Sequence, residues 1–307
     1  MRRPPLGGAT ISGLSSSRPL CAETSLAHAE PVGATASRVD TWILLEYRGL
    51  WAHDAVDGST LSEELKAFLR AERGRLPHAR ILFVRSGERR RQDGLLAFLA
   101  RTNGAHGELR RLELDRHDDL IGLDLETAGA PVGHPLFLVC THGKHDRCCA
   151  KYGRPLYDTV REQVEEGWVW QSTHVGGDRF AGNLVALPEG VYYGRVEPSE
   201  AWPVIEASLA GRVHLPCYRG RSCHGFAAQA AELGVREETG LLGISDVRVR
   251  SIERAGDGWR AEVEGGGTVY DVDVRREEGE ATHLTCSTAA LKRPSRYVAG
   301  SPRARAS

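Results

Sequence analysis

The sequence has no excess charge of one sign and no long hydrophobic run. Its 40 lysines and arginines balance 41 acidic residues, so the formal net charge is -1. No basic field therefore draws the chain to nucleic acid or to an anionic membrane surface. No apolar run approaches the roughly 20 residues that a membrane span needs, and residues 1–19 lack the continuous apolar core of a secretory signal. These absences predict a cytoplasmic protein with no nucleic-acid or membrane partner.

The cysteines lack the even, regular spacing of a secreted disulfide framework. Their number is odd, two of them are adjacent, and no CxxC motif of a thioredoxin-type oxidoreductase is present. Such a set is typical of reduced thiols in a cytosolic protein, most of them structural and a subset metal-binding. The seven are Cys21, Cys140, Cys148, Cys149, Cys217, Cys223 and Cys286.

Composition and periodicity divide the chain into five segments. The N-terminus is rich in Gly, Pro, Ser and Ala without periodicity, which predicts a disordered tail. The remainder has the length of about two domains. The predicted segments are a tail over 1–38, an α/β domain over 39–130, a thioredoxin-like domain over 131–212, a C-terminal helix and small antiparallel meander over 213–300, and a tail over 301–307.

The first α/β domain is predicted from apolar runs of strand length and one amphipathic helix. Strands are expected at 41–47, 80–85, 95–100 and 109–115. The helix over 61–72 is predicted to begin at an N-cap, Thr60, with Glu63 completing a capping box. This order is compatible with a second, degenerate thioredoxin-like unit, although no internal sequence repeat is evident.

The next domain alternates between strands and helices in an informative order. Its strands and helices follow the pattern β-α-β-β-β-α, which matches a thioredoxin-like domain with a parallel βαβ half and an antiparallel hairpin half. The expected elements are strands at 135–140, 168–174, 183–188 and 191–196 and helices at 154–166 and 198–211.

The C-terminal part begins with a helix and continues with alternating stretches. The helix is predicted over 227–240 and ends at Gly240. Four short strands, the first three of them separated by glycine-rich turns, predict the meander. These strands are expected at 247–253, 259–264, 268–274 and 283–288.

Two loops that follow neighbouring parallel strands carry the metal-binding residue types. Cys140 ends one strand, Cys149 follows nine residues later at the start of a helix, His174 ends the next strand, and Asp178 follows four residues later. Carboxyl ends of parallel strands are where α/β proteins place their sites, and a helix N-terminus favours a thiolate. The pair Gly176–Gly177 would let the backbone approach a bulky inorganic group. A nine-residue loop suits an iron–sulfur cluster, but spacing alone does not separate a cluster from zinc.

The two motifs CTHGKHDRCCAKYGRP (140–155) and HVGGDRFAGN (174–183) resemble those of the sucrase/ferredoxin-like family. The sequences YYGRV (192–196) and YRGRSC (218–223) also fit its bacterial members, and the resemblance extends from about Cys21 to the C-terminus. It implies a thioredoxin-like ferredoxin with a [2Fe–2S] cluster. Fungal members use two cysteines and two histidines as ligands. No pair of acids suited to glycoside cleavage supports a sucrase activity.

Carried over to this chain, the resemblance places ligands on Cys140, Cys149 and His174, while Asp178 stands where the family has its second histidine. Three outcomes stay open: Asp178 is the fourth ligand, another nearby group completes the set, or this branch has lost the cluster. The other nearby groups are Cys148, His142 and His145.

The function expected is electron transfer or redox sensing together with a redox partner protein, rather than catalysis on a substrate of its own. The alternative is a cluster-free thioredoxin-fold thiol protein or a structural zinc-binding protein. The residues do not identify the electron donor, the acceptor or the oligomeric state.

Overall fold

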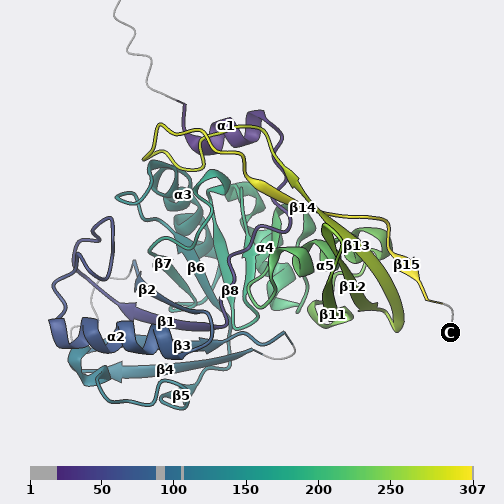
Figure 1. The fold of residues 1–307 in the computed structure, drawn as a ribbon. Coiled ribbons are helices and arrows are strands. Elements are labelled where there is room, and N and C mark those ends of the chain that lie inside the picture. The colour runs from purple at the N-terminus through teal and green to yellow at the C-terminus, as the bar shows by residue number, and fades with distance from the viewer. Residues whose placement is uncertain (1–18, 88–93, 105–106, 306–307) are drawn as a thin grey trace, which may run out of the picture.

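The computed structural model describes residues 19–87, 94–104 and 107–305 (Figure 1). The mixed α/β class predicted from the sequence is confirmed. The helices are α1 (Cys21–Ala27), α2 (Glu63–Arg75), α3 (Arg147–Gln163), α4 (Ala201–Leu209) and α5 (Phe226–Thr239). The strands of the large sheet are β1 (Thr41–Glu46), β2 (Ala79–Arg85), β3 (Leu95–Arg101), β4 (Glu108–Leu114), β5 (Ala130–Pro131), β6 (Leu136–Cys140), β7 (Val169–Ser172), β8 (Leu184–Leu187), β9 (Val191–Tyr193) and β10 (Tyr218–Arg221).

This sheet is built from two halves with the same connectivity. Its 10 strands lie in the order β10-β9-β8-β6-β7-β2-β1-β3-β4-β5. In each half a parallel strand–helix–strand unit is followed by two antiparallel strands, namely β1-α2-β2-β3-β4 and β6-α3-β7-β8-β9. The halves meet where β2 pairs antiparallel with β7. One continuous sheet therefore crosses the boundary predicted at residue 130.

The central strands are buried and mostly apolar because both sheet faces are covered. All residues of β1 and β6 are buried, as is typical of strands with packed layers on both sides. Figure 1 shows α3 beside β6 and β7, and α2 packs on β2. Close approach of α3 to the sheet depends on Gly153, because a Cβ atom there would overlap the carbonyl oxygen of Cys140. This contact fixes the start of α3 next to the end of β6.

Residues 19–38, predicted as part of a disordered tail, instead form α1 and an extended segment packed on the protein. Cys21, Ser25 and Glu30 are buried, and Arg179 donates to both carboxylate oxygens of Glu30. Tertiary contacts order this segment although its composition is poor in large apolar residues. Residues 1–18 of the predicted tail lie outside the described residues.

The C-terminal sheet differs in part from the predicted meander. Its strands are β11 (Val247–Ala255), β12 (Gly258–Gly265), β13 (Thr268–Glu278), β14 (Ser295–Ala299) and β15 (Arg303–Ala304). The predicted strand at 283–288 is wrong, since this segment instead runs beside α1 and α3, where Cys286 donates its backbone N–H to Asp146. The predicted tail over 301–307 is also wrong at β15, which pairs with β13.

The capping residues predicted from the sequence are wrong at the start of one helix and right at the end of another. The N-cap of α2 is Ser62, whose hydroxyl accepts from the backbone N–H of Leu65, and not Thr60, whose hydroxyl bonds to Tyr47. In contrast, α5 ends at Gly240 as predicted, and this glycine has a φ of 71°. Within the described ranges every helix is too short or too polar to span a bilayer.

Candidate metal centre

The loops after β6 and β7 bring three donor side chains to one point. Cys140 is the last residue of β6, Cys149 lies in the first turn of α3, and His174 follows β7. One donor atom from each lies within 4.8 Å of the other two. Both cysteines are only 1% exposed, whereas His174 is partly exposed. The parallel pairing of β6 and β7 and the short loop to α3 produce this convergence.

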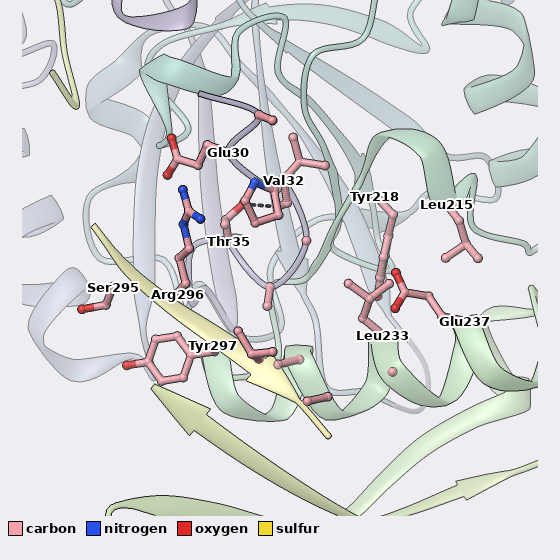
Figure 2. Close-up of a pocket in the computed structure, with 18 of the residues that line it drawn as sticks. Glu30, Val32, Thr35, Leu215, Tyr218, Leu233, Glu237, Ser295, Arg296 and Tyr297 are labelled. Carbon is pink, nitrogen blue, oxygen red and sulfur yellow. Dashed lines mark hydrogen bonds between the residues drawn. The ribbon is translucent and has the colours of Figure 1, made fainter. Parts of the chain in front are cut away.

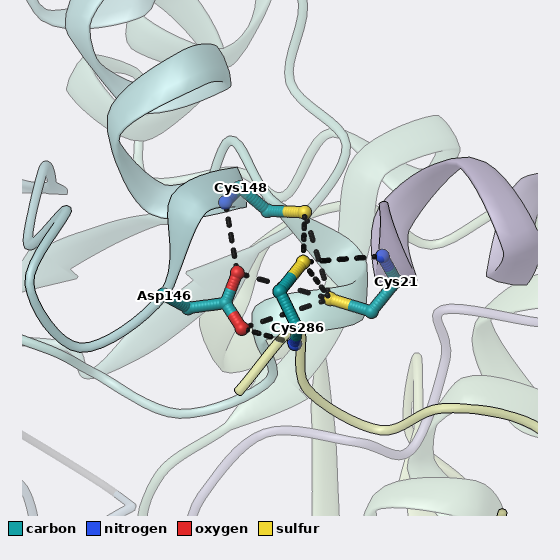
Figure 3. A group of neighbouring side chains, drawn as sticks. All are labelled: Cys21, Asp146, Cys148 and Cys286. Carbon is teal, nitrogen blue, oxygen red and sulfur yellow. Dashed lines mark hydrogen bonds between the residues drawn. The ribbon is translucent and has the colours of Figure 1, made fainter. Parts of the chain in front are cut away.

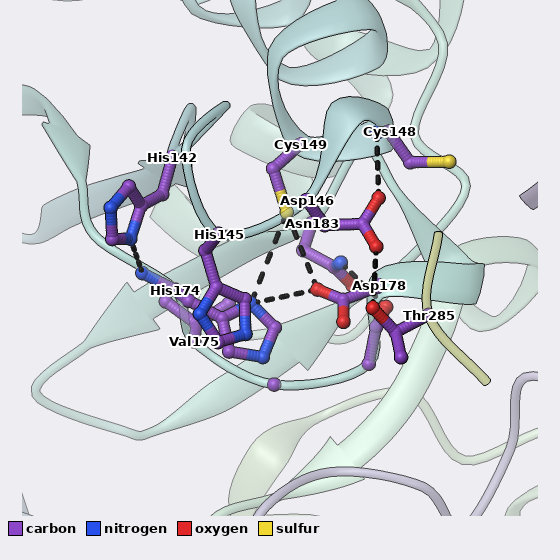
Figure 4. Close-up of polar contacts among 12 residues, drawn as sticks. His142, His145, Asp146, Cys148, Cys149, His174, Val175, Asp178, Asn183 and Thr285 are labelled. Carbon is purple, nitrogen blue, oxygen red and sulfur yellow. Dashed lines mark hydrogen bonds and ion pairs between the residues drawn. The ribbon is translucent and has the colours of Figure 1, made fainter. Parts of the chain in front are cut away.

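Asp178 lies directly against this group (Figure 4). Its Oδ1 atom is 2.9 Å from Nδ1 of His174 and 3.5 Å from Sγ of Cys149. The Cys149 Sγ to His174 Nδ1 distance is 3.9 Å. Asp178 is 7% exposed. The structure therefore brings together all four residues singled out from the sequence, although their role as ligands stays a prediction.

Hydrogen bonds within the group separate the protonation states of its members. Hydrogen bonds from Cys149 and then His174 lower the pKa of Cys140 although burial opposes this. The adjacent Cys140 sulfur and burial raise the pKa of Cys149. Burial by itself lowers the pKa of His174, but hydrogen bonds to Asp178 and Cys140 outweigh it and raise the pKa to about 9. These pKa shifts favour loss of the proton from Cys140 before Cys149 and retention of the proton by His174, and a bound metal would displace the remaining protons.

His142 is occupied by backbone hydrogen bonds. Its Nε2 lies 2.7 Å from the carbonyl oxygen of Ala52, and its Nδ1 accepts from the backbone N–H of His174 at 3.4 Å. With both ring nitrogens engaged, His142 holds the two loops in register. It does not offer a free donor to the centre.

His145 is the second candidate for a fourth ligand. One of its ring nitrogens lies within 4.8 Å of donor atoms of both His174 and Asp178. Its ring stacks on His174 with centroids 4.0 Å apart and on the exposed His53 with centroids 4.8 Å apart. These rings line a cleft of about 510 Å³, so the histidine side is where the centre opens to solvent.

Cys148 is directed away from the centre despite its place next to Cys149. Its Sγ atom lies 3.4 Å from Sγ of Cys286 and 3.5 Å from Sγ of Cys21. Figure 4 shows the sulfur atoms of the adjacent cysteines pointing to different sides of the turn. Of the four alternatives for the fourth position, Asp178 and His145 are the two whose donor atoms group with that of His174.

A buried arginine, whose position the sequence did not indicate, holds the loop that follows β7. Arg219 donates to the carbonyl oxygen of Gly176 at 2.9 Å and to Oδ1 of Asn183 at 2.7 Å. A Cβ atom on Gly177, whose φ is +82°, would lie 2.5 Å from this guanidinium. Gly177 therefore makes room for Arg219, and the approach of an inorganic group to the glycine pair stays a prediction. No signal in YRGR (218–221) distinguishes a buried arginine from an exposed one.

A larger cleft of about 890 Å³ lies elsewhere, between the N-terminal segment, α5 and β14 (Figure 2). Glu30, Leu233 and Tyr297 are among its lining residues, and none of the donor residues of the centre lines it. The larger cleft is therefore not the one beside the candidate metal centre.

Comparison with known proteins decides the family. The sucrase/ferredoxin-like family profile matches residues 32–220, more than half of the chain. The chain belongs to the sucrase/ferredoxin-like family. The matched part of this sucrase/ferredoxin-like chain contains Cys140, Cys149, His174 and Asp178. The match is narrower than the sequence motifs predicted, because it leaves out α5 and the C-terminal sheet.

Curated relatives of this sucrase/ferredoxin-like chain share only a segment with it. Altered inheritance of mitochondria protein 32 from Meyerozyma guilliermondii is 37% identical over 98 residues, covering 28% of this chain and 34% of the relative. The protein of that name from Debaryomyces hansenii is 29% identical over 99 residues, covering 29% of this chain and 36% of the relative. The chain therefore spans about a third of the length of these two relatives.

Among solved structures, two chains of the thioredoxin-like [2Fe–2S] ferredoxin from Aquifex aeolicus are similar in part. A cysteine-to-serine variant is 17% identical with a TM-score of 0.26, and the match covers 29% of this chain and 100% of that chain. A second structure is 19% identical with a TM-score of 0.23, covering 26% of this chain and 84% of that chain.

Proposed function

We propose that this chain binds a [2Fe–2S] cluster through Cys140, Cys149, His174 and Asp178 and serves electron transfer or redox sensing. The observation that carries the proposal is the convergence of two buried thiols, an imidazole and a carboxylate at the ends of β6 and β7, within the part matched to the family. We assign a thioredoxin-like fold to the half formed by β6, α3, β7, β8, β9 and α4, because its connectivity has the order predicted above.

The donor types fit such a cluster. Thiolates are the usual cluster ligands, and imidazole replaces thiolate in centres of higher potential. When bound, the cluster supplies a one-electron redox couple. The chain's own residues contribute burial of the sulfur donors, a fixed orientation of His174 through its bond to Asp178, and an imidazole whose proton affinity is already raised by these neighbours.

We infer that electrons enter and leave on the histidine side. His174, His145 and His53 stack in sequence from the buried thiols to the surface. A redox partner protein would dock over this cleft. We place the protein in the cytoplasm, since none of the seven cysteines is in a disulfide and reducing compartments keep cysteines in that state.

The test is anaerobic purification of the full chain followed by iron and acid-labile sulfide analysis. We expect equal amounts of iron and sulfide, a brown-red colour and a signal in electron paramagnetic resonance after reduction. Cys140→Ser should lose iron, whereas Cys217→Ser, which changes another buried cysteine outside the centre, should keep it. Iron content unaffected by Cys140→Ser would contradict the proposal.

A single zinc ion at this centre is the second candidate. The observation that favours it is compactness, since the donor atoms of Cys140, Cys149 and His174 all lie within 4.8 Å of one another, and zinc accepts this donor set. Zinc without sulfide, lost in Cys140→Ser, would support this candidate and reject the cluster.

A further inference from the structure

Three cysteines far apart in the sequence meet at a second point (Figure 3). Cys21 begins α1, Cys148 lies in the first turn of α3, and Cys286 lies in the segment before β14. The sulfur–sulfur distances are 3.5 Å for Cys21 to Cys148, 3.4 Å for Cys148 to Cys286 and 3.5 Å for Cys286 to Cys21. Cys21 and Cys148 are fully buried. The sulfurs thus form a nearly equilateral triangle in which two members are shielded from water and Cys286 is partly exposed.

The carboxylate of Asp146 lies across one side of this triangle. Both of its oxygens are 3.9 Å from Sγ of Cys21. It caps α3 by accepting from the backbone N–H of Cys148 at 2.8 Å, and it also accepts from the hydroxyl of Thr285 at 2.8 Å and the backbone N–H of Cys286. Donor atoms of Asp146 and the three cysteines all lie within 4.8 Å of one another.

The triangle has the dimensions of a tetrahedral thiolate site. A Zn–S bond of about 2.3 Å places the sulfurs of a tetrahedron about 3.8 Å apart, close to the observed separations. A disulfide would use two sulfurs and leave the third unpaired, whereas near-equal sides indicate a common centre. The backbone N–H of Cys21 also donates to Sγ of Cys286 at 3.3 Å, a contact that suits a charged sulfur acceptor.

We propose that Cys21, Cys148 and Cys286 bind one Zn²⁺ ion, with Asp146 as the fourth ligand. Three soft thiolates favour zinc over magnesium or calcium, and four protein ligands without an open position are typical of a structural site. The ion fastens α1 and the segment around Cys286 to the start of α3. This site shares no donor with the centre formed by Cys140, Cys149 and His174.

Two of these ligands lie outside the region matched to the family. Cys21 precedes residue 32 and Cys286 follows residue 220. The site therefore joins both extensions of the chain to the matched region, and its ligand Cys148 directly precedes Cys149 of the redox centre. It does not depend on whether that centre binds a cluster.

The test measures zinc by elemental analysis in the full chain purified with thiols reduced. We expect one zinc ion per chain, lost in Cys286→Ser and kept in two controls. Cys223→Ser changes a buried cysteine outside both groups, and Cys140→Ser disables only the other centre. Zinc unchanged in Cys286→Ser, or iron lost from it, would overturn the proposal. So would a reduced wild-type chain that neither contains zinc nor takes up added Co²⁺ with the absorption bands of tetrahedral thiolate coordination.

Thiol labelling of the wild-type chain keeps the test decisive if Cys286→Ser does not fold. In the zinc-loaded protein, peptide mass spectrometry should find Cys21, Cys148 and Cys286 protected from alkylation. Addition of a zinc chelator should speed their labelling at least tenfold and leave the rate at Cys223 unchanged. Equal rates with and without chelator, or a disulfide between any two of the three, would overturn the proposal.

Discussion

Cys148 and Cys149 are consecutive residues whose sulfur atoms belong to two different groups. Cys148 Sγ lies 3.4 Å from Sγ of Cys286, and Cys149 Sγ lies 3.5 Å from Oδ1 of Asp178. The rotation of about 100° between successive helical residues separates the two side chains at the start of α3. One helical turn thus takes part in two potential metal centres.

This relationship predicts opposite metal losses from two neighbouring substitutions. Cys149→Ser removes a thiolate from the redox centre and should abolish or severely reduce bound iron while zinc stays. Cys148→Ser should remove zinc while iron stays. Parallel iron, sulfide and zinc analysis of both variants checks this. Loss of the same metal from both would show that the two sulfurs serve one centre.

Asp178 sets the charge of the redox centre if it is a ligand. Replacing the carboxylate by imidazole in Asp178→His removes a negative charge, so the reduction potential should rise and a second pH-dependent step should appear. Asp178→Ala should loosen the cluster. Potential titrations across pH measure both effects. An Asp178→His variant with an intact cluster, the wild-type potential and the wild-type pH slope would show that Asp178 does not touch iron.

Arg219 is expected to stabilise the loop that carries His174. Its guanidinium group donates hydrogen bonds to Gly176, Asn183 and Thr35. A lysine keeps the positive charge but cannot make all of these hydrogen bonds. Arg219→Lys should lower the free energy of unfolding by about 2–3 kcal/mol, because buried polar partners lose their hydrogen bonds. Urea unfolding measures the change. The exposed Arg212→Lys is the control, and equal effects would contradict the role of Arg219.

A buried ion pair in α5 predicts acid sensitivity. Glu232 and Arg236 are fully buried with a 2.9 Å contact. Burial by itself raises the pKa of Glu232, but Arg236 and His224 outweigh it and hold the pKa below its ordinary value of 4.5. A lowered carboxyl pKa stabilises the fold above pH 4.5, and this contribution is lost as the pH falls through the lowered value.

Glu232→Gln should therefore destabilise the protein at pH 7 by about 3–5 kcal/mol, since Arg236 loses its counter-ion. It should also weaken the fall of stability below pH 4.5. Denaturant titrations between pH 7 and pH 3 measure both. The matched control is Asp158→Asn in the exposed pair with Arg154, also four residues apart, which should cost less than about 1 kcal/mol. Similar losses in the two variants would refute the argument.

The sequence by itself determined the local elements and the first donor group. Continuous apolar runs indicated buried strands, and Cys140, Cys149 and His174 follow two strands of one βαβ unit. Because carboxyl ends of neighbouring parallel strands share one edge of a sheet, the chain order was enough to bring these donors together. Asp178 follows only four residues after His174, so the same local argument included it.

Only the tertiary structure decided the contacts between distant segments. Cys21 lies in a stretch whose composition predicts disorder, and Cys286 lies in one whose alternation predicts a strand, yet both meet Cys148. The direction of Cys148 away from Cys149, and the burial of Arg219, likewise depend on which segments pack around them. Composition and periodicity report the preferences of a short segment, whereas such contacts come from the packing of residues more than a hundred positions apart.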